Sequence, residues 1–336
     1  MRSQALLIGA TGIIGSEVRA QLAAQFEVYS VSRTGSEAEG VHSLHEFEYR
    51  RGRRTWDVVV NCSGNTRWTM TGEQARSANV EPLEWVMAAA GGCHLIHVST
   101  AFVGGIQDEI SGGITFRNEY ERSKALAEEV VAGYDGPLTI VRPGLVLGRF
   151  TDGHIRRFVG IYTIVRSLAS GLAAVMVGDQ AIRVELIHVD QVARVIADAA
   201  GAPPTSTICE VNPGGGERAL TVGNVVEVAL ECLNRYRVTH GVERIPDPPF
   251  LSAESWSRFF RPFSEGVLST THLRAIDLLS EFSNYTSHGA RVAVTHPVDV
   301  TRESFARSVA YWLDGNGRAA ARPLPLLPGP GGATRA

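Results

Sequence analysis

Short apolar runs alternate with longer amphipathic segments through the first half of the chain. The apolar runs are too short for helices, and they predict buried strands at residues 5–10, 26–33, 57–64, 94–102 and 138–148. Apolar side chains recur at helical spacing in residues 16–25, 75–90 and 119–134. Strands that alternate with helices are typical of βαβ units and of a parallel sheet covered on both faces. The pattern therefore predicts an α/β fold with a doubly wound parallel sheet of the Rossmann type.

The alternation loosens after Gly148. Residues 150–180 have a helical pattern, residues 183–201 return to a strand followed by a helix, and residues 207–216 end another strand. We expect a Rossmann domain made of residues 1–149 and 181–213. Residues 150–180 and 214–318 would form a smaller, helix-rich C-terminal substrate subdomain, and the proline- and glycine-rich residues 319–336 a disordered tail.

Composition and charge limit the classes of partner. The 336 residues are 44% hydrophobic and carry a formal net charge of −3, which disfavours general binding to nucleic acid or to anionic membranes. No apolar run is long and uncharged enough to span a membrane, and the glycines near the start interrupt any secretory signal. The four cysteines are scattered and indicate free thiols in a reducing compartment. We therefore expect a cytoplasmic protein.

Three glycines follow the first predicted strand, in the sequence GATGIIG. Gly9 permits a sharp turn, Gly12 lets the backbone approach a pyrophosphate at a helix start, and Gly15 lets helix and strand pack closely. The spacing differs from the commoner G-x-G-x-x-G, and an ordinary strand–helix connection without a ligand would use glycines too. The position before a helix favours a dinucleotide site.

The end of the second strand indicates which dinucleotide is bound. An acidic residue there commonly binds the ribose hydroxyls of NAD, but this strand ends with Ser32 and Arg33. A guanidinium group suits the 2′-phosphate of NADP, because it is always charged and donates two parallel hydrogen bonds. The sequence therefore favours NADP(H).

Two further segments carry residues suited to carbonyl chemistry. Tyr120 and Lys124 are four residues apart and lie on one face of a predicted helix, where an ammonium group lowers the pKa of a neighbouring phenol. Ser99 and Thr100 end a predicted strand, and a hydroxyl there can hydrogen-bond a developing oxyanion. Taken alone, the tyrosine and lysine would more simply be a surface helical pair.

The glycine loop, the strand-end hydroxyl residues and the tyrosine–lysine pair follow one another along the chain. Together they resemble the motifs of the extended short-chain dehydrogenases/reductases. The resemblance rests on GATGIIG, on Thr100 with Tyr120 and Lys124, and on IVRPGLVLG, and it covers residues 4–215. It implies that Tyr120 is the general acid/base, that Lys124 binds the nicotinamide ribose and tunes Tyr120, and that Thr100 polarises the substrate carbonyl with Ser99 nearby. The cofactor residues that it implies are Gly9, Thr11, Gly12, Ile13, Ile14, Gly15, Ser32, Arg33, Cys62, Ser63, Gly64, Tyr120, Lys124, Pro143, Gly144 and Val146.

Within this superfamily the chain is similar to the fatty acyl-CoA reductases and thioester reductases, the male-sterility-like group. The similar segments are NTRW, ANVEPLEWV, HVSTAFVGG and residues 176–200. The resemblance implies that NADPH reduces an acyl thioester, held on CoA or on a carrier protein supplied in trans, to an aldehyde or an alcohol. The Gly-Asp pair that often follows the third strand is missing, which leaves the adenine contacts open.

Two other functions fit the same motifs. One is a ketone or alcohol dehydrogenase or a sugar-nucleotide epimerase; Arg33 counts against an epimerase, since epimerases usually retain NAD. Ala101 and Phe102 stand where dehydratases carry acidic residues, and they suit an apolar substrate. The other is a non-catalytic dinucleotide sensor, which the intact set of Thr100, Tyr120 and Lys124 disfavours.

Histidines and apolar helix faces have ordinary structural explanations. His94 and His97 are three apart on a strand and should point to opposite faces of the sheet, so they do not form a metal site. His188 is expected to make structural hydrogen bonds or to line the pocket. The apolar faces of residues 74–90 and 118–133 fit either a homodimer interface or core packing.

Overall fold

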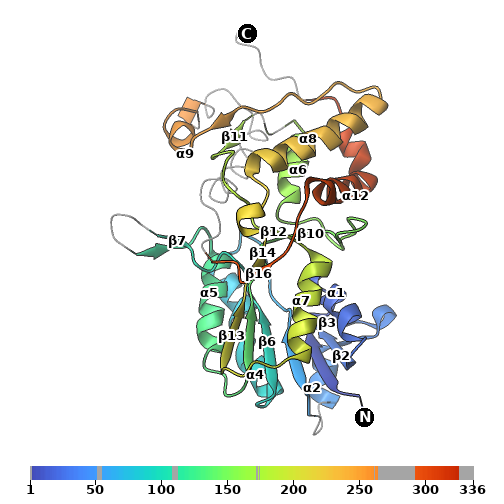
Figure 1. Ribbon diagram of the computed structural model, residues 1–336, viewed down its shortest axis with the longest axis vertical. Helices are drawn as coiled ribbons and strands as arrows, with labels where there is room; N and C mark the ends of the chain where they lie inside the picture. The colour runs from blue at the N-terminus through green and yellow to red at the C-terminus, as the bar shows by residue number, and fades with distance from the viewer. Residues whose placement is uncertain are drawn as a thin grey trace, which may run out of the picture.

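The computed structural model describes residues 2–50, 55–107, 113–171, 173, 175–260, 262–263 and 292–324. An eight-stranded sheet forms the base of the molecule, with its strands in the order β13-β9-β6-β5-β1-β2-β4-β3 (Figure 1). Its strands are β1 (Gln4–Ile8), β2 (Glu27–Ser32), β3 (Thr34–Ser36), β4 (Val41–Ser43), β5 (Val58–Asn61), β6 (His94–Val98), β9 (Leu138–Val141) and β13 (Ile208–Val211).

All neighbouring strands of this sheet pair in parallel except β3 and β4, which pair antiparallel. The chain leaves β1 toward β2 on one side and returns to β5 on the other, so the strand order reverses between β1 and β5. In open α/β sheets, ligands bind at the carboxyl ends of the strands beside such a reversal. The topology therefore marks the edge of the sheet at which a site is expected.

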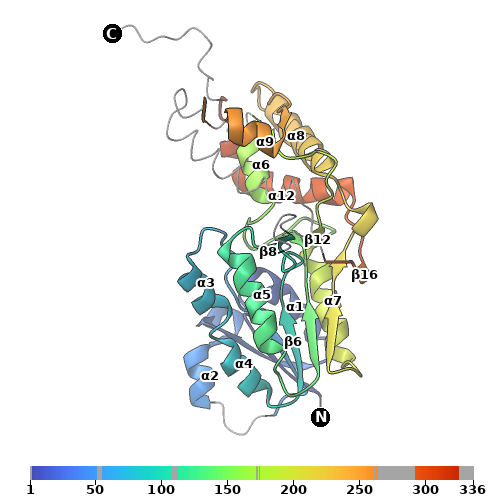
Figure 2. The same cartoon turned by 90° about the vertical axis from the view of Figure 1, so that its left-hand side faces the viewer.

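Helices cover both faces of the sheet (Figure 2). The helices α1 (Ile13–Leu22) and α7 (Val189–Gly201) share one apolar core with the sheet. The other face carries α2 (Leu44–Arg50), α3 (Gly72–Asn79), α4 (Leu83–Ala90) and α5 (Glu119–Val131). The apolar positions of α4 and α5 are buried in this second core, so core packing accounts for the pattern that also fitted a dimer interface.

The structure differs from the sequence interpretation at two prolines. Residues 75–90 form two helices instead of one, because Pro82 has no N–H group and disfavours a helical conformation of the residue before it. Residues 138–148 form two strands, with Pro143 between β9 and β10 (Leu145–Leu147). The latter pairs with β12 (Leu186–His188) outside the main sheet. The strand expected at residues 94–102 ends at Val98.

Three helices form a separate apolar core above the sheet: α6 (Tyr162–Ala169), α8 (Val222–Thr239) and α12 (Arg302–Ala320). The remaining elements are short: β7 (Ile106–Gln107), β8 (Ile114–Thr115), β11 (Met176–Val177), β14 (Pro213–Gly214), β15 (Phe250–Leu251), β16 (His296–Pro297), the turns η1 (Glu37–Glu39) and η2 (Gly216–Arg218), α9 (Ala253–Ser255) and the π-helix η3 (Trp256–Phe260). The helix α12 continues two residues into the expected tail, and residues 325–336 lie outside the described part of the chain.

His188 joins the helical part to the sheet part. One of its ring nitrogens is hydrogen-bonded to the carbonyl oxygen of Gly148, and the other lies 2.8 Å from the Ser304 hydroxyl on α12. The imidazole is fully buried, and burial lowers its pKa. The expectation of structural hydrogen bonds at this histidine is confirmed. Among the described residues, none of the helices combines the length and the apolar character that crossing a membrane requires.

The helical core depends on Phe305, which is fully buried on α12. We expect Phe305→Ala to lower the free energy of unfolding by about 3–5 kcal/mol, because it removes buried area and leaves a cavity. Urea-induced unfolding measures this change. The matched control is Phe259→Ala, since 72% of Phe259 is exposed, and it should change the free energy by less than about 0.5 kcal/mol. Equal losses in the two variants would contradict the packing described here.

Candidate functional site

The glycine loop holds the start of α1 against the carboxyl ends of β1 and β5. Gly9 has a φ of +84°, and a Cβ atom on it would lie 2.7 Å from the backbone carbonyl of Cys62. A Cβ atom on Gly15 would lie 2.1 Å from the carbonyl oxygen of Gly9. Only glycine leaves room for these two close backbone contacts, because any side chain at either position would clash. The helix thus begins beside the point where the strand order reverses.

The first turn of α1 is suited to an anion. Gly12 is the N-cap residue, no side chain caps the helix, and the first turn contains no acidic residue. The backbone N–H groups of a first helical turn have no partner within the helix, and the helix dipole favours negative charge there. These features fit the pyrophosphate of a dinucleotide.

A cavity of about 180 Å³ opens at this edge of the sheet. Thirteen of the residues expected from the sequence line it: Gly12, Ile13, Ile14, Cys62, Ser63, Gly64, Ser99, Thr100, Tyr120, Lys124, Pro143, Gly144 and Val146. The other five, Gly9, Thr11, Gly15, Ser32 and Arg33, do not line it. Gly9 and Gly15 support the loop from behind, and Ser32 and Arg33 lie at and just after the end of β2.

Two buried hydroxyl groups near this edge have no hydrogen-bond partner among the described residues. They belong to Ser99, which lines the cavity, and to Ser32 at the end of β2. A buried hydroxyl without a partner costs free energy, and a bound ligand would remove that cost. Together with the glycine loop, these hydroxyls show that the residues present fit a dinucleotide. No cluster of potential metal ligands occurs within the described ranges.

Tyr120 and Thr100 share a side-chain hydrogen bond inside the cavity. Tyr120 lies in the first turn of α5, which Asn118 caps by accepting the N–H of Glu121 at 3.0 Å. Burial raises the pKa of Tyr120 to about 12, the bond to Thr100 lowers it, and the charge of Glu121 raises it. The phenol therefore holds its proton at neutral pH.

Lys124 is directed toward β6. Its Nζ donates to the carbonyl oxygen of Val98 at 2.8 Å and lies 3.3 Å from Nε2 of His97. Burial lowers the pKa of Lys124 to about 8, while electrostatic interactions with Glu128 and Cys62 raise it. The sequence interpretation expected Lys124 to lower the pKa of Tyr120, but burial, Thr100 and Glu121 account for the shift of that pKa. The physical reason is that burial dominates the pKa of the phenol, while the lysine is bound to the strand.

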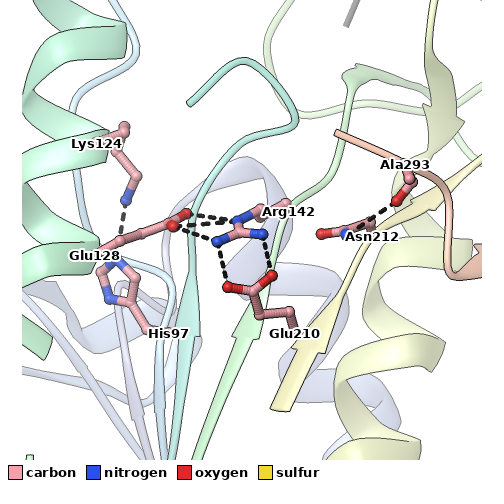
Figure 3. A network of polar contacts seen from close by, with 7 residues as sticks. All are labelled: His97, Lys124, Glu128, Arg142, Glu210, Asn212 and Ala293. Atoms are coloured by element: carbon pink, nitrogen blue, oxygen red, sulfur yellow. Dashed lines mark hydrogen bonds and ion pairs between the residues drawn. The ribbon is translucent and has the colours of Figure 1, made fainter. Parts of the chain in front are cut away.

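Arg142 fixes the segment that leads into Pro143. Its guanidinium group lies between two carboxylates, with hydrogen bonds of 2.6–3.1 Å to Glu128 on α5 and of 2.6 and 2.8 Å to Glu210 on β13 (Figure 3). Planar double pairs of this kind are strong and directional. The network ties α5, β9 and β13 together directly beside the cavity.

Two ion pairs hold the segment after β10 to the Rossmann part. Arg149 lies 2.8 Å from Glu17 on α1, and Arg156 makes two hydrogen bonds of 2.7 Å to Glu39, just before β4. The next residue, Arg157, lines the cavity together with Val159 and Gly160. The sequence interpretation missed these three residues, because their approach depends on contacts more than one hundred residues apart in the chain.

One sequence signal for the site was also overlooked. Lys124 is the only lysine in the chain, since the remaining 31 of its 32 basic residues are arginines. A buried amine at this position can change its protonation state, which a guanidinium group cannot do in a protein. The two histidines do point to opposite faces of the sheet, as predicted: His97 contacts Lys124 on the α5 side, and His94 is hydrogen-bonded to Thr139 on the other face.

One protein-family model matches part of the chain. Residues 38–196 match the NAD-binding family model described as "Male sterility protein". The matched stretch contains Ser99, Thr100, Tyr120 and Lys124 and begins after the glycine loop. A search of curated protein sequences finds no match.

Solved structures share the fold. A thiolation-reductase di-domain from an archaeal non-ribosomal peptide synthetase superposes with a TM-score of 0.68 and 17% identity, over 95% of this chain and 76% of the other. The terminal R domain from the myxalamid PKS-NRPS pathway gives 0.64 and 17%, over 94% and 92%. The UDP-glucose 4-epimerase of Thermus thermophilus, in complex with NAD, gives 0.56 and 19%, over 92% and 98%. The fold class predicted from the sequence is confirmed.

The match of residues 38–196 to the male-sterility family model confirms the resemblance to that group over this stretch. The solved structures, at 17–19% identity, show the fold.

The Gly15 contact gives a direct test of the cofactor cradle. We expect Gly15→Ala to weaken NADP⁺ binding by at least about tenfold, because the added methyl group pushes α1 away from Gly9. Calorimetric titration measures the affinity. Gly133→Ala is the control, since the nearest atom to its Cβ lies 3.5 Å away. Unchanged affinity in Gly15→Ala would show that the cradle does not need this close approach.

Proposed function

We propose that the protein is an NADPH-dependent reductase of acyl thioesters that are carried on CoA or on a separate carrier protein. The observation that carries the proposal is the pairing of the protonated Tyr120 with Thr100, next to the unpartnered Ser99 hydroxyl, in a cavity with an apolar wall. The family match and the reductase-domain folds support the same class of substrate.

In this proposal the three polar residues act on the carbonyl oxygen of the thioester. Thr100 and Ser99 donate hydrogen bonds to the oxygen as negative charge develops on it. A dinucleotide held at the first turn of α1 would, when bound, supply the hydride for the carbonyl carbon. Tyr120 gives its proton to the oxygen, and the resulting hemithioacetal breaks its C–S bond to release an aldehyde and a thiol.

The wall of the cavity favours an acyl group over a sugar. Trp68, Phe102, Leu145 and Val159 line it from four separate segments. Apolar side chains gain free energy by burying an alkyl chain, whereas sugar hydroxyls require many polar partners. We infer that the acyl chain lies along these residues and that a carrier or CoA remains outside.

The cofactor preference is also a proposal. Arg33 is exposed at the end of β2, close to the unpartnered Ser32 hydroxyl, and a 2′-phosphate would be bound by both. The four cysteines are free thiols, which supports a reducing compartment such as the cytoplasm.

Turnover with defined substrates tests the function. We expect NADPH to be consumed with acyl-CoA or acyl-carrier thioesters, and Tyr120→Phe to reduce turnover by at least about a hundredfold because the proton donor is lost. Tyr134→Phe is the matched control, since its hydroxyl donates to the carbonyl oxygen of Cys93 instead of facing the cavity. Turnover of UDP-sugars or simple ketones, with none of thioesters, would assign the protein to the alternative activities.

Cofactor choice is tested at Arg33. We expect Arg33→Ala to weaken NADP⁺ binding by at least about tenfold and to leave NAD⁺ binding unchanged, because only NADP⁺ carries the 2′-phosphate. Arg76→Ala, an exposed arginine on α3, is the control. An equal loss for both cofactors would show that Arg33 does not read the phosphate.

A further inference from the structure

We propose that His97 is a positioning residue that opposes the positive charge of Lys124 in the cofactor-free protein, so that cofactor binding is coupled to uptake of a proton at Lys124. The coupling to cofactor binding rests on the proposed function. The effect of His97 on the charge of Lys124 concerns only the protein without a ligand.

The orientation of the Asn61 side-chain amide is the starting point. The backbone N–H of Ser63 donates to Oδ1 of Asn61 at 3.1 Å, and the Ser63 hydroxyl donates to the same atom at 2.6 Å. A backbone N–H is always a donor, so the atom that faces it must be the amide oxygen. The NH₂ group of Asn61 is therefore turned toward His97.

The amide of Asn61 determines the tautomer of His97. Its Nδ2 lies 3.2 Å from Nδ1 of His97, and an NH₂ group can only donate. The Nδ1 atom must accept this hydrogen bond, so a neutral imidazole carries its proton on Nε2. The imidazole is neutral because it is buried, and burial holds its pKa well below the usual value.

The proton on Nε2 of His97 faces Nζ of Lys124 at 3.3 Å. An ammonium group can only donate hydrogen bonds. Its N–H would face the Nε2–H of His97 in a buried space, with no acceptor between them. A neutral amine has a lone pair that accepts from Nε2–H, and it still donates to Val98 at 2.8 Å. A series of hydrogen bonds leads from Ser63 through Asn61, His97 and Lys124 to the carbonyl oxygen of Val98. Each of these contacts has one donor and one acceptor when Lys124 carries no charge.

The other titratable groups around Lys124 do not cancel this effect. Glu128 favours the charged lysine, but Arg142 binds its carboxylate with three hydrogen bonds. Burial raises the pKa of Cys62 and of Tyr120 to about 12, so both are uncharged. Burial lowers the pKa of the Lys124 amine to about 8, which is the same direction as the effect proposed for His97.

A bound dinucleotide would change the balance. Its phosphates are negative and would occupy the cavity that Lys124 lines, and negative charge raises the pKa of a nearby amine. The amine then takes one proton from water or buffer and becomes an ammonium group, with no other bond made or broken. Cofactor affinity should accordingly fall as the pH rises from the pKa of Lys124 in the cofactor-free protein to its higher pKa in the complex, and should level off above both.

The single lysine makes the test direct. The full chain, prepared with nitrogen-15-labelled lysine, gives one side-chain amine signal by NMR. We expect its titration midpoint in the cofactor-free protein to lie at least about one pH unit below that of an ordinary lysine, and to rise by a similar amount with saturating NADP⁺. A midpoint in the ordinary range without cofactor would overturn the inference.

Three variants separate the role of His97 from burial. In Asn61→Asp, the carboxylate accepts from Nδ1–H, which frees Nε2 to accept from the ammonium group, so the midpoint should rise. His97→Gln should raise it as well, because the amide oxygen can turn to Lys124. His94→Gln, the same change on the opposite face of β6, should leave it unchanged. A midpoint in His97→Gln equal to that of the native protein would remove His97 from this role.

Calorimetry distinguishes failure of the inference from failure of the proposed function. NADP⁺ binding measured near pH 8 in two buffers with different ionisation enthalpies reports the protons taken up. Binding without proton uptake would overturn the coupling alone. Absence of binding for both NADP⁺ and NAD⁺ would contradict the proposed function, while the titration of the free protein would still test the His97 network.

Discussion

The contact between the first turn of α1 and the ends of β1 and β5 is the constraint on which the site depends. Gly9 and Gly15 leave no room for a side chain, so the helix start meets the sheet backbone directly. The uncapped N–H groups of α1 are thereby brought to the same cavity as Cys62 and Ser63 from β5. If α1 were displaced by the width of one methyl group, its first turn would no longer be aligned with the groups that are proposed to react.

The opposite wall of the cavity depends on a buried ion pair. Arg117 and Glu121 are almost completely buried, 3.2 Å apart, and the guanidinium group of Arg117 lies over the ring of Phe102. A buried pair contributes little net stability, but breaking it leaves an uncompensated charge. This pair therefore fixes the start of α5, and with it Tyr120, relative to the apolar wall. The negative charge of Glu121 also helps to keep the proton on Tyr120.

Local pattern predicts the strands, the glycine loop and the tyrosine–lysine spacing, because each reflects periodicity or backbone geometry within a few residues. Pro82 and Pro143 divide segments that the apolar pattern joins, and a stricter use of proline as a breaker would have found both. Arg157 could not be found in this way, since it reaches the cavity through arginine pairs that span more than one hundred residues. The face of the sheet on which His97 lies follows from alternation, but its tautomer depends on the backbone of Ser63. Such features are set by three-dimensional contacts that no local pattern records.

The protonation states in the cavity favour one direction of chemistry. Reduction of a carbonyl needs a proton donor, and Tyr120 holds its proton because burial and Glu121 both oppose the phenolate. Oxidation of an alcohol would need that phenolate, whereas burial disfavours the ammonium form of Lys124, which lines the same cavity. In the proposed coupling, a ligand that brings negative charge makes this ammonium group more favourable. The hydrogen bonds that Thr100 and Ser99 are proposed to donate to the carbonyl oxygen do not depend on that charge, so the groups proposed for reduction are in place in either state of Lys124.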